Sequence, residues 1–126
     1  MNRSLTVVLA FAMVIAATSV AALLIAQRPT PEDTNAVAIN VTARQWNYTP
    51  SEIRVKEGQT VILHLKSVDV PHGFVIEEYR VNAFLPPGET VDVKFTANQA
   101  GEFQYFCNVF CGTGHPNHKG KLIVEK

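Results

Sequence analysis

From residue 36 onward, apolar and polar side chains alternate in short runs of strand length. The runs cover residues 37–41, 61–65, 91–95, 103–107 and 122–124. Such alternation places one set of side chains on a buried face of a strand and the other set on its opposite face. Turn signals interrupt the runs at 57–58, 86–88 and 99–101. The pattern predicts an all-β antiparallel sandwich or barrel.

His64 lies in the run Val61-Ile-Leu-His64-Leu65, between two apolar positions of the same face. Strict alternation assigns Val61, Leu63 and Leu65 to the core and His64 to the outer face. We therefore expect His64 to be a solvated strand residue with no part in a metal site.

The N-terminal part has a different pattern, because Leu5 to Ala26 is a run of 22 residues without a charge. This length predicts one transmembrane helix. We expect residues 1–27 to be a membrane anchor, 28–35 a linker and 36–126 a single domain. A cleaved signal peptide is the alternative, because Ser19-Val-Ala21 has the small residues of a cleavage site. Either reading predicts export, and the anchor predicts a single-pass cell-membrane protein with its domain on the extracytoplasmic, periplasmic or outer, face.

The formal net charge is +0, with 11 basic and 11 acidic residues. Nucleic-acid binding needs a basic patch, and Lys119 and Lys121 are too few to make one, so no nucleic-acid partner is expected. The chain also has no nucleophile elbow, no phosphate-binding glycine loop and no His-Glu-x-x-His helix.

Both cysteines and two of the four histidines lie between Cys107 and His118, in Cys-Asn-Val-Phe-Cys-Gly-Thr-Gly-His-Pro-Asn-His. Thiolates and imidazoles together select copper, zinc or iron over hard cations. Structural zinc sites usually use Cys-x-x-Cys pairs, which this chain lacks, so zinc ranks second. A disulfide is the other alternative for an exported pair of cysteines, although it would leave the histidines unexplained.

This loop, together with Val-Asp-Val-Pro-His72-Gly-Phe upstream, resembles the copper A domain of cytochrome c oxidase subunit II, in its compact single-anchor form. The resemblance covers roughly residues 36 to 126. It implies an antiparallel Greek-key cupredoxin sandwich in which the metal loop joins the last two strands and His72 arrives from the opposite sheet. It also implies a dinuclear copper centre, with a mononuclear centre still possible. The implied ligands are the bridging thiolates of Cys107 and Cys111, the imidazoles of His72 and His115, and the backbone carbonyl of Val109.

The sequence departs from this family at the last ligand, where His118 occupies the position of a methionine. Imidazole is a harder donor than a thioether and favours Cu(II) over Cu(I). Three outcomes are open: a dinuclear centre with His118 as an altered axial ligand, a mononuclear copper site, or His118 turned away from the metal.

Trp46 is the only tryptophan, and the pair Gln45-Trp46 is similar to a pair at which subunit II receives electrons. The resemblance implies electron entry at Trp46; a core or edge aromatic is the commoner role of such a residue. The implied function is a membrane-anchored relay of single electrons from cytochrome c or a cupredoxin donor to the catalytic subunit of a heme-copper oxidase. Such a chain is an electron-transfer subunit rather than a catalyst on its own. The alternative is an exported copper-binding or copper-delivery cupredoxin without an oxidase partner.

Overall fold

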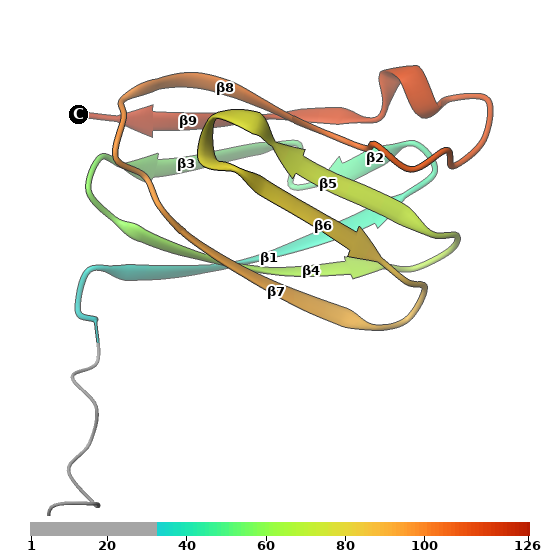
Figure 1. The fold of residues 1–126 in the computed structure, drawn as a ribbon, viewed down its shortest axis with the longest axis horizontal. Coiled ribbons are helices and arrows are strands. Elements are labelled where there is room, and N and C mark those ends of the chain that lie inside the picture. Colours follow the sequence, from blue (N-terminus) through green and yellow to red (C-terminus); the bar gives the residue numbers. More distant parts are fainter. Residues whose placement is uncertain (1–32) are drawn as a thin grey trace, which may run out of the picture. The chain divides into compact units, whose positions relative to one another are not determined.

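The alternating runs form strands of two packed β-sheets in the computed structural model, which describes residues 33–126 (Figure 1). The elements are β1 (Ala36–Arg44), β2 (Asn47–Thr49), β3 (Glu52–Lys56), β4 (Thr60–Ser67), β5 (His72–Ile76), η1 (Glu77–Tyr79), β6 (Val81–Leu85), β7 (Thr90–Thr96), β8 (Gly101–Phe106), η2 (His115–Asn117) and β9 (Lys119–Glu125). The four-stranded sheet has the order β2-β1-β4-β7, and the five-stranded sheet has the order β3-β9-β8-β5-β6. The prediction of an all-β sandwich is confirmed.

Strand β4 shows how the alternation builds the core. Val61, Leu63 and Leu65 are fully buried between the sheets. His64 lies on the other face, where its Nδ1 is 2.7 Å from Oδ1 of Asp92 on β7. The prediction that His64 points out of the core is therefore confirmed.

The sequence pattern missed four strands, β2, β3, β5 and β6. Strand β5 explains why period two failed there, because all five of its residues are buried. A strand covered on both faces has no polar side to alternate with. Strands β2 and β3 offer one and two buried positions, which is too few for a pattern.

The expectation of purely antiparallel pairing is wrong for two pairs of strands. Strand β1 pairs with β4 in parallel from Ala36↔Thr60 to Ala43↔Ser67, and β3 pairs with β9 in parallel. Parallel neighbours need a crossover connection. Here the chain provides one by passing through the other sheet, as β3, between β1 and β4.

The connections β1–β2, β4–β5, β6–β7 and β8–β9 gather at one end of the sandwich, on the right of Figure 1. The metal loop joins β8 to β9, the last two strands, as the resemblance implied. His72 starts β5, which lies in the same sheet as β8 and β9, so its expected arrival from the opposite sheet is wrong. Residues 33–126 contain no helix long and apolar enough to cross a bilayer. The predicted anchor, residues 1–27, lies outside the described part of the chain.

Candidate metal centre

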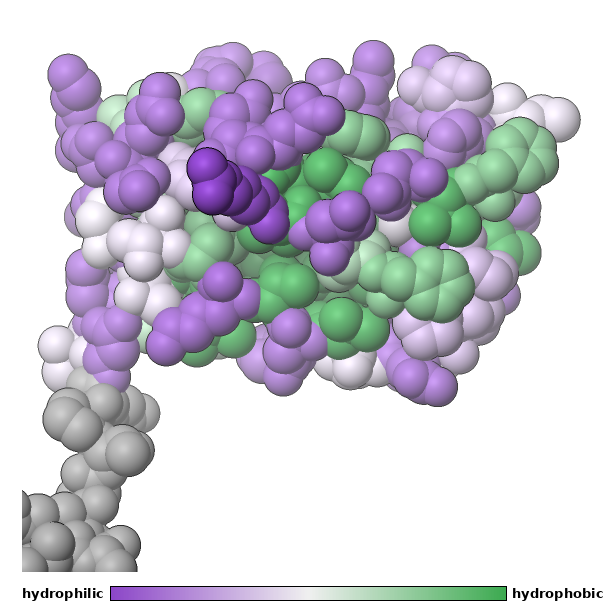
Figure 2. All heavy atoms as spheres, in the orientation of Figure 1, coloured by the Kyte–Doolittle hydropathy of each residue, from purple (hydrophilic) through white to green (hydrophobic). Residues whose placement is uncertain are grey.

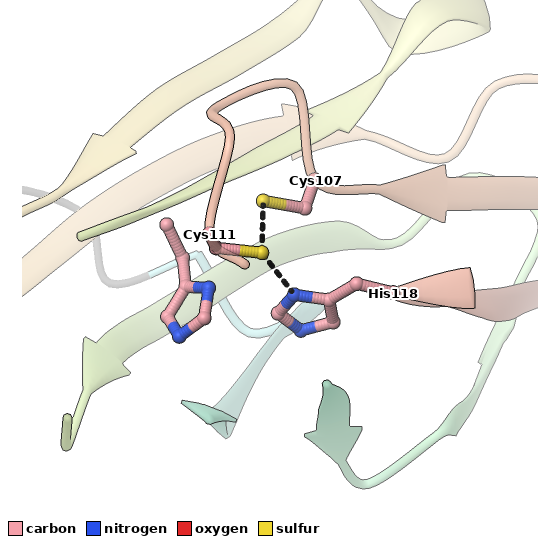
Figure 3. A group of neighbouring side chains, drawn as sticks. Cys107, Cys111 and His118 are labelled. Carbon is pink, nitrogen blue, oxygen red and sulfur yellow. Dashed lines mark hydrogen bonds between the residues drawn. The ribbon is translucent and has the colours of Figure 1, made fainter. Parts of the chain in front are cut away.

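Four buried side chains converge at this end of the sandwich: His72, Cys107, Cys111 and His118. One nitrogen or sulfur atom from each lies within 4.8 Å of all the others. The two sulfur atoms are 3.7 Å apart, and both thiols are free (Figure 3). Two metal–sulfur bonds of about 2.3 Å that meet at a tetrahedral angle span about this distance, so the two sulfur atoms are already spaced to hold a soft metal ion between them.

Backbone hydrogen bonds close the metal loop and bring its two ends together. The N–H of Cys107, directly after β8, donates to the carbonyl of His118 at 3.0 Å. The turn η2 begins at His115 with Pro116 behind it, and the N–H of His118 donates to the carbonyl of His115 at 3.1 Å. This turn folds His118 back into the core, where 1% of its surface is exposed.

His72 is oriented by a carboxylate on its far side. Its Nε2 is 2.8 Å from Oδ1 of Asp69, and its Nδ1 is buried with no hydrogen-bond partner. Burial would raise the pKa of Asp69, but backbone N–H donors of Gln45 and Val70 hold that pKa below its usual value. Asp69 therefore stays ionised, fixes the ring and leaves Nδ1 free for a metal, as carboxylates do behind histidine ligands.

His118 lies on the other side of the sulfur pair. Its Nδ1 is 3.6 Å from Sγ of Cys111, and its ring stacks on Tyr48 with centroids 4.1 Å apart. Burial, helped by the neighbouring His72, lowers the pKa of His118 to about 4. The ring is therefore neutral at neutral pH, which is the state that binds metals. Nδ1 of His118 therefore faces the sulfur pair, and which of the three outcomes holds remains a prediction.

His115 lies outside the group of four but beside the same sulfur. Its Nδ1 is also 3.6 Å from Sγ of Cys111, and its ring is only partly buried, next to Phe110. Cys111 therefore has two imidazoles within reach. The ligand roles of His115 and His118 remain predictions.

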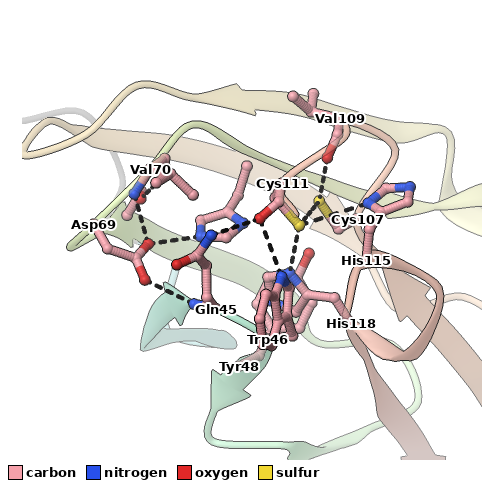
Figure 4. Close-up of polar contacts among 12 residues, drawn as sticks. Gln45, Trp46, Tyr48, Asp69, Val70, Cys107, Val109, Cys111, His115 and His118 are labelled. Atoms are coloured by element: carbon pink, nitrogen blue, oxygen red, sulfur yellow. Dashed lines mark hydrogen bonds and ion pairs between the residues drawn. The ribbon is translucent and has the colours of Figure 1, made fainter. Parts of the chain in front are cut away.

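The carbonyl of Val109, the backbone ligand that the resemblance implied, lies close to the first cysteine. It accepts a hydrogen bond from Sγ of Cys107 at 3.0 Å, which places it beside the sulfur pair (Figure 4). Its role as a weak ligand remains a prediction, for which this position is suitable.

The thiol of Cys111 keeps its proton at neutral pH unless a cation binds to the sulfur. Burial, followed by the neighbouring Cys107, raises the pKa of the Cys111 thiol to about 12. A metal ion must displace this proton when it binds, so metal binding to this loop releases protons and becomes tighter as pH rises.

The depressed pKa of His118 gives a pH prediction for the metal-free chain. The unfolded chain takes up a proton near pH 6.5, whereas folded His118 does so only near pH 4. Stability should therefore fall as pH drops through this window, by up to about 3 kcal/mol. Urea unfolding of the wild type and of His118→Met at pH 7.5 and 4.5 measures this loss. An equal loss in both proteins would mean that His118 titrates normally.

Sequence reasoning gave Tyr48 and Asp69 no role in building the site, and it noted Gln45 only as the neighbour of Trp46 in the resembling pair. The spacing of Asp69 three residues before His72 was a usable signal, because carboxylates often orient histidine ligands. Gln45 and Tyr48 gave no such signal, since only the fold brings them to the loop. Trp46, the predicted entry residue, is 38% exposed, and its Nε1 donates to the carbonyl of Cys111 at 3.0 Å.

A family model described as a cupredoxin-like domain matches residues 8–124, so the chain belongs to the cupredoxin-like family. The chain is 35% identical over 92 residues to cytochrome c oxidase subunit 2 of Thermus thermophilus, covering 73% of this chain and 68% of that protein. A second subunit 2 from the same species is also 35% identical, and the chain spans 55% of it. These relatives confirm the resemblance to subunit II.

Among solved structures, a heme-copper terminal oxidase dimer contains a chain with the same fold. Its TM-score to this chain is 0.65 at 24% identity, covering 98% of this chain and all of that one. At this identity the likeness extends to the fold alone. The soft donor set and the family together fit copper.

Proposed function

We propose that this chain is a copper electron-transfer protein of the subunit II kind, which relays single electrons to the catalytic subunit of a heme-copper oxidase. The observation that carries the proposal is the buried cluster of two thiols and two imidazoles in a cupredoxin sandwich. The relationship to subunit 2 of Thermus thermophilus supports the choice of partner. The chain would be one subunit of the oxidase rather than a catalyst on its own.

The fold suits such a relay because the donors are held rigidly. Cys107 and His72 adjoin paired strands, and a backbone hydrogen bond closes the loop between Cys107 and His118. Copper, when bound, would supply reversible one-electron chemistry. Small ligand motion on a change of charge keeps electron transfer fast, and the carboxylate behind His72 restricts its ring. We propose His72, Cys107, Cys111 and His115, with His118 and the carbonyl of Val109, as the residues that hold copper.

The surface around the site offers a place for electron exchange. Four large hydrophobic residues are exposed within residues 33–126: Trp46 at 38%, Val68 at 46%, Phe84 at 57% and Phe110 at 80%. Trp46, Val68 and Phe110 lie in the connections at the metal end, and Phe84 lies on β6, where it pairs with Gly73 of β5. Figure 2 shows apolar side chains reaching this end of the molecule, on its right. The four connections here carry only two charged residues, Asp69 and Glu89. A redox partner would therefore dock by apolar contact, with Trp46 as the proposed entry point.

Electron uptake from a reduced cytochrome c tests the relay. We expect the copper-loaded chain to be reduced and reoxidised repeatedly, with a rate constant that changes by less than about threefold between 50 and 300 mM salt, because few charges steer the encounter. Stopped-flow spectroscopy measures the redox cycling and the salt dependence of the rate constant. A chain that cannot cycle, but passes copper to a metal-free acceptor, would be a copper-delivery protein instead.

The uncharged run Leu5 to Ala26 supports a further part of the proposal, that the chain is a single-pass membrane protein with its domain on the extracytoplasmic face. Mature protein that begins at or next to Met1 and stays with membranes in high salt would support the anchor. Soluble exported protein that begins near Ala22 would contradict it.

A further inference from the structure

The carbonyl of Cys111 accepts two hydrogen bonds from adjacent side chains of the β1–β2 connection. Nε2 of Gln45 donates to it at 2.8 Å, and Nε1 of Trp46 donates to it at 3.0 Å (Figure 4). A carbonyl oxygen has two lone pairs. Both are satisfied here, so the backbone at the second cysteine is held from one side by a distant segment of the chain.

The same connection reaches the other side of the site through Asp69. The backbone N–H of Gln45 donates to Oδ2 of Asp69 at 2.7 Å, and Oδ1 of Asp69 is 2.8 Å from Nε2 of His72. Three hydrogen bonds therefore lead from the ring of His72, through Asp69 and Gln45, to the backbone of Cys111. These two candidate ligands come from different segments, and this path fixes one relative to the other.

Packing supports the hydrogen bonds. A Cβ atom on Gly114 would overlap the indole ring of Trp46, and one on Gly112 would lie 3.0 Å from it. Gly112 also has a φ of +118°, a backbone angle that residues with a side chain rarely adopt. The chain after Cys111 therefore runs directly over the indole, with two glycines where contact is closest.

We propose that Gln45 and Trp46 together form a clamp that positions Cys111 relative to His72, so that Gln45, which is no ligand, tunes the metal centre. The clamp rests on the proposed copper site and adds to it. It gives Trp46 a positioning role separate from electron entry, and it gives Gln45 a role where none was expected. Partners that orient metal ligands typically change metal affinity by ten- to a hundredfold when they are mutated.

The experiment compares the full-length chain with Gln45→Glu, Trp46→Phe and the double variant. Glutamate keeps the shape of glutamine but replaces a donor with an acceptor, and phenylalanine keeps a ring without the N–H. The matched control is Gln104→Glu, at an exposed position on β8. We expect about tenfold weaker copper retention against a chelator in each single variant, with a shifted thiolate-to-copper absorption. The double variant should lose more than the product of the two, because either donor alone still holds the shared carbonyl.

A second readout needs no copper. The chain has one tryptophan, so its indole N–H gives a single proton resonance. In the metal-free protein this proton should exchange slowly, and it should shift and exchange faster in Gln45→Glu but not in Gln104→Glu. This measurement separates the two proposals. A wild type that binds no copper would contradict the proposed electron relay, whereas slow exchange of the indole proton would still support the clamp.

Copper retention, absorption and indole exchange in Gln45→Glu that match those of Gln104→Glu would overturn the clamp. Slower electron uptake in Trp46→Phe with an unchanged spectrum and unchanged retention would also overturn it, leaving Trp46 with the entry role alone. Circular dichroism checks that each variant is folded, and if Gln45→Glu unfolds, Trp46→Phe carries the test.

Discussion

Replacing Cys111 by serine is expected to abolish the intense thiolate-to-copper absorption of the loaded chain. Cys111 is the donor at the centre of the cluster: its sulfur is 3.7 Å from Sγ of Cys107 and 3.6 Å from Nδ1 of both His115 and His118. Serine keeps the size but loses the soft donor that selects copper. Copper affinity should fall by more than about a hundredfold, since even the partners of ligands cost ten- to a hundredfold.

Absorption spectra and metal analysis measure this effect. The copper-to-protein ratio of the wild type distinguishes one copper ion from two. Zinc in place of copper would favour a structural zinc site. His64→Ala is the control, because His64 lies on the outer face of β4 and pairs with Asp92. An unaltered spectrum in Cys111→Ser would exclude the two-thiolate site and leave at best a mononuclear centre on Cys107.

Replacing His118 by methionine is expected to raise the reduction potential of the copper centre. Nδ1 of His118 faces Sγ of Cys111 from within the core, and a neutral imidazole stabilises Cu(II) more than a thioether does. Each tenfold change in relative affinity for the two oxidation states shifts the potential by about 60 mV. The shift should therefore be upward by at least this amount.

Redox titration of the full-length chain measures the potential, and His64→Met is the matched control with the same substitution outside the site. A lowered or unchanged potential in His118→Met would mean that His118 contributes to the core but not to the metal. Nδ1 of His72, which has no hydrogen-bond partner, would then form the donor set with the two thiolates and His115.

Much of this architecture was accessible from the sequence because it depends on local order. Alternation in residues 61–65 predicts a strand with one buried face, and glycine and proline mark the turns between the strands. Two cysteines and two histidines lie within twelve residues, so closure of the loop brings their sulfur and nitrogen atoms close together. The resemblance to subunit II, read from the loop and from the segment around His72, is confirmed by the relatives.

Other features were decided by tertiary contacts. Strand β5 is buried on both faces, so its sequence has no alternation, and its place in the sheet of β8 follows from pairing between Val75 and Phe106. The parallel pairing of β1 with β4 depends on a crossover through the other sheet, which no local pattern encodes.

The sequence by itself determined the class of fold and the chemistry of the donors, because strand periodicity and ligand softness are properties of residue types in short order. Only the tertiary structure decided which imidazoles face the sulfur pair and what holds them. His118 enters the core because η2 folds back onto β8, and Gln45 reaches both Asp69 and the backbone of Cys111 from the β1–β2 connection. Hydrogen bonds between segments so distant in sequence form only when the sheets pack.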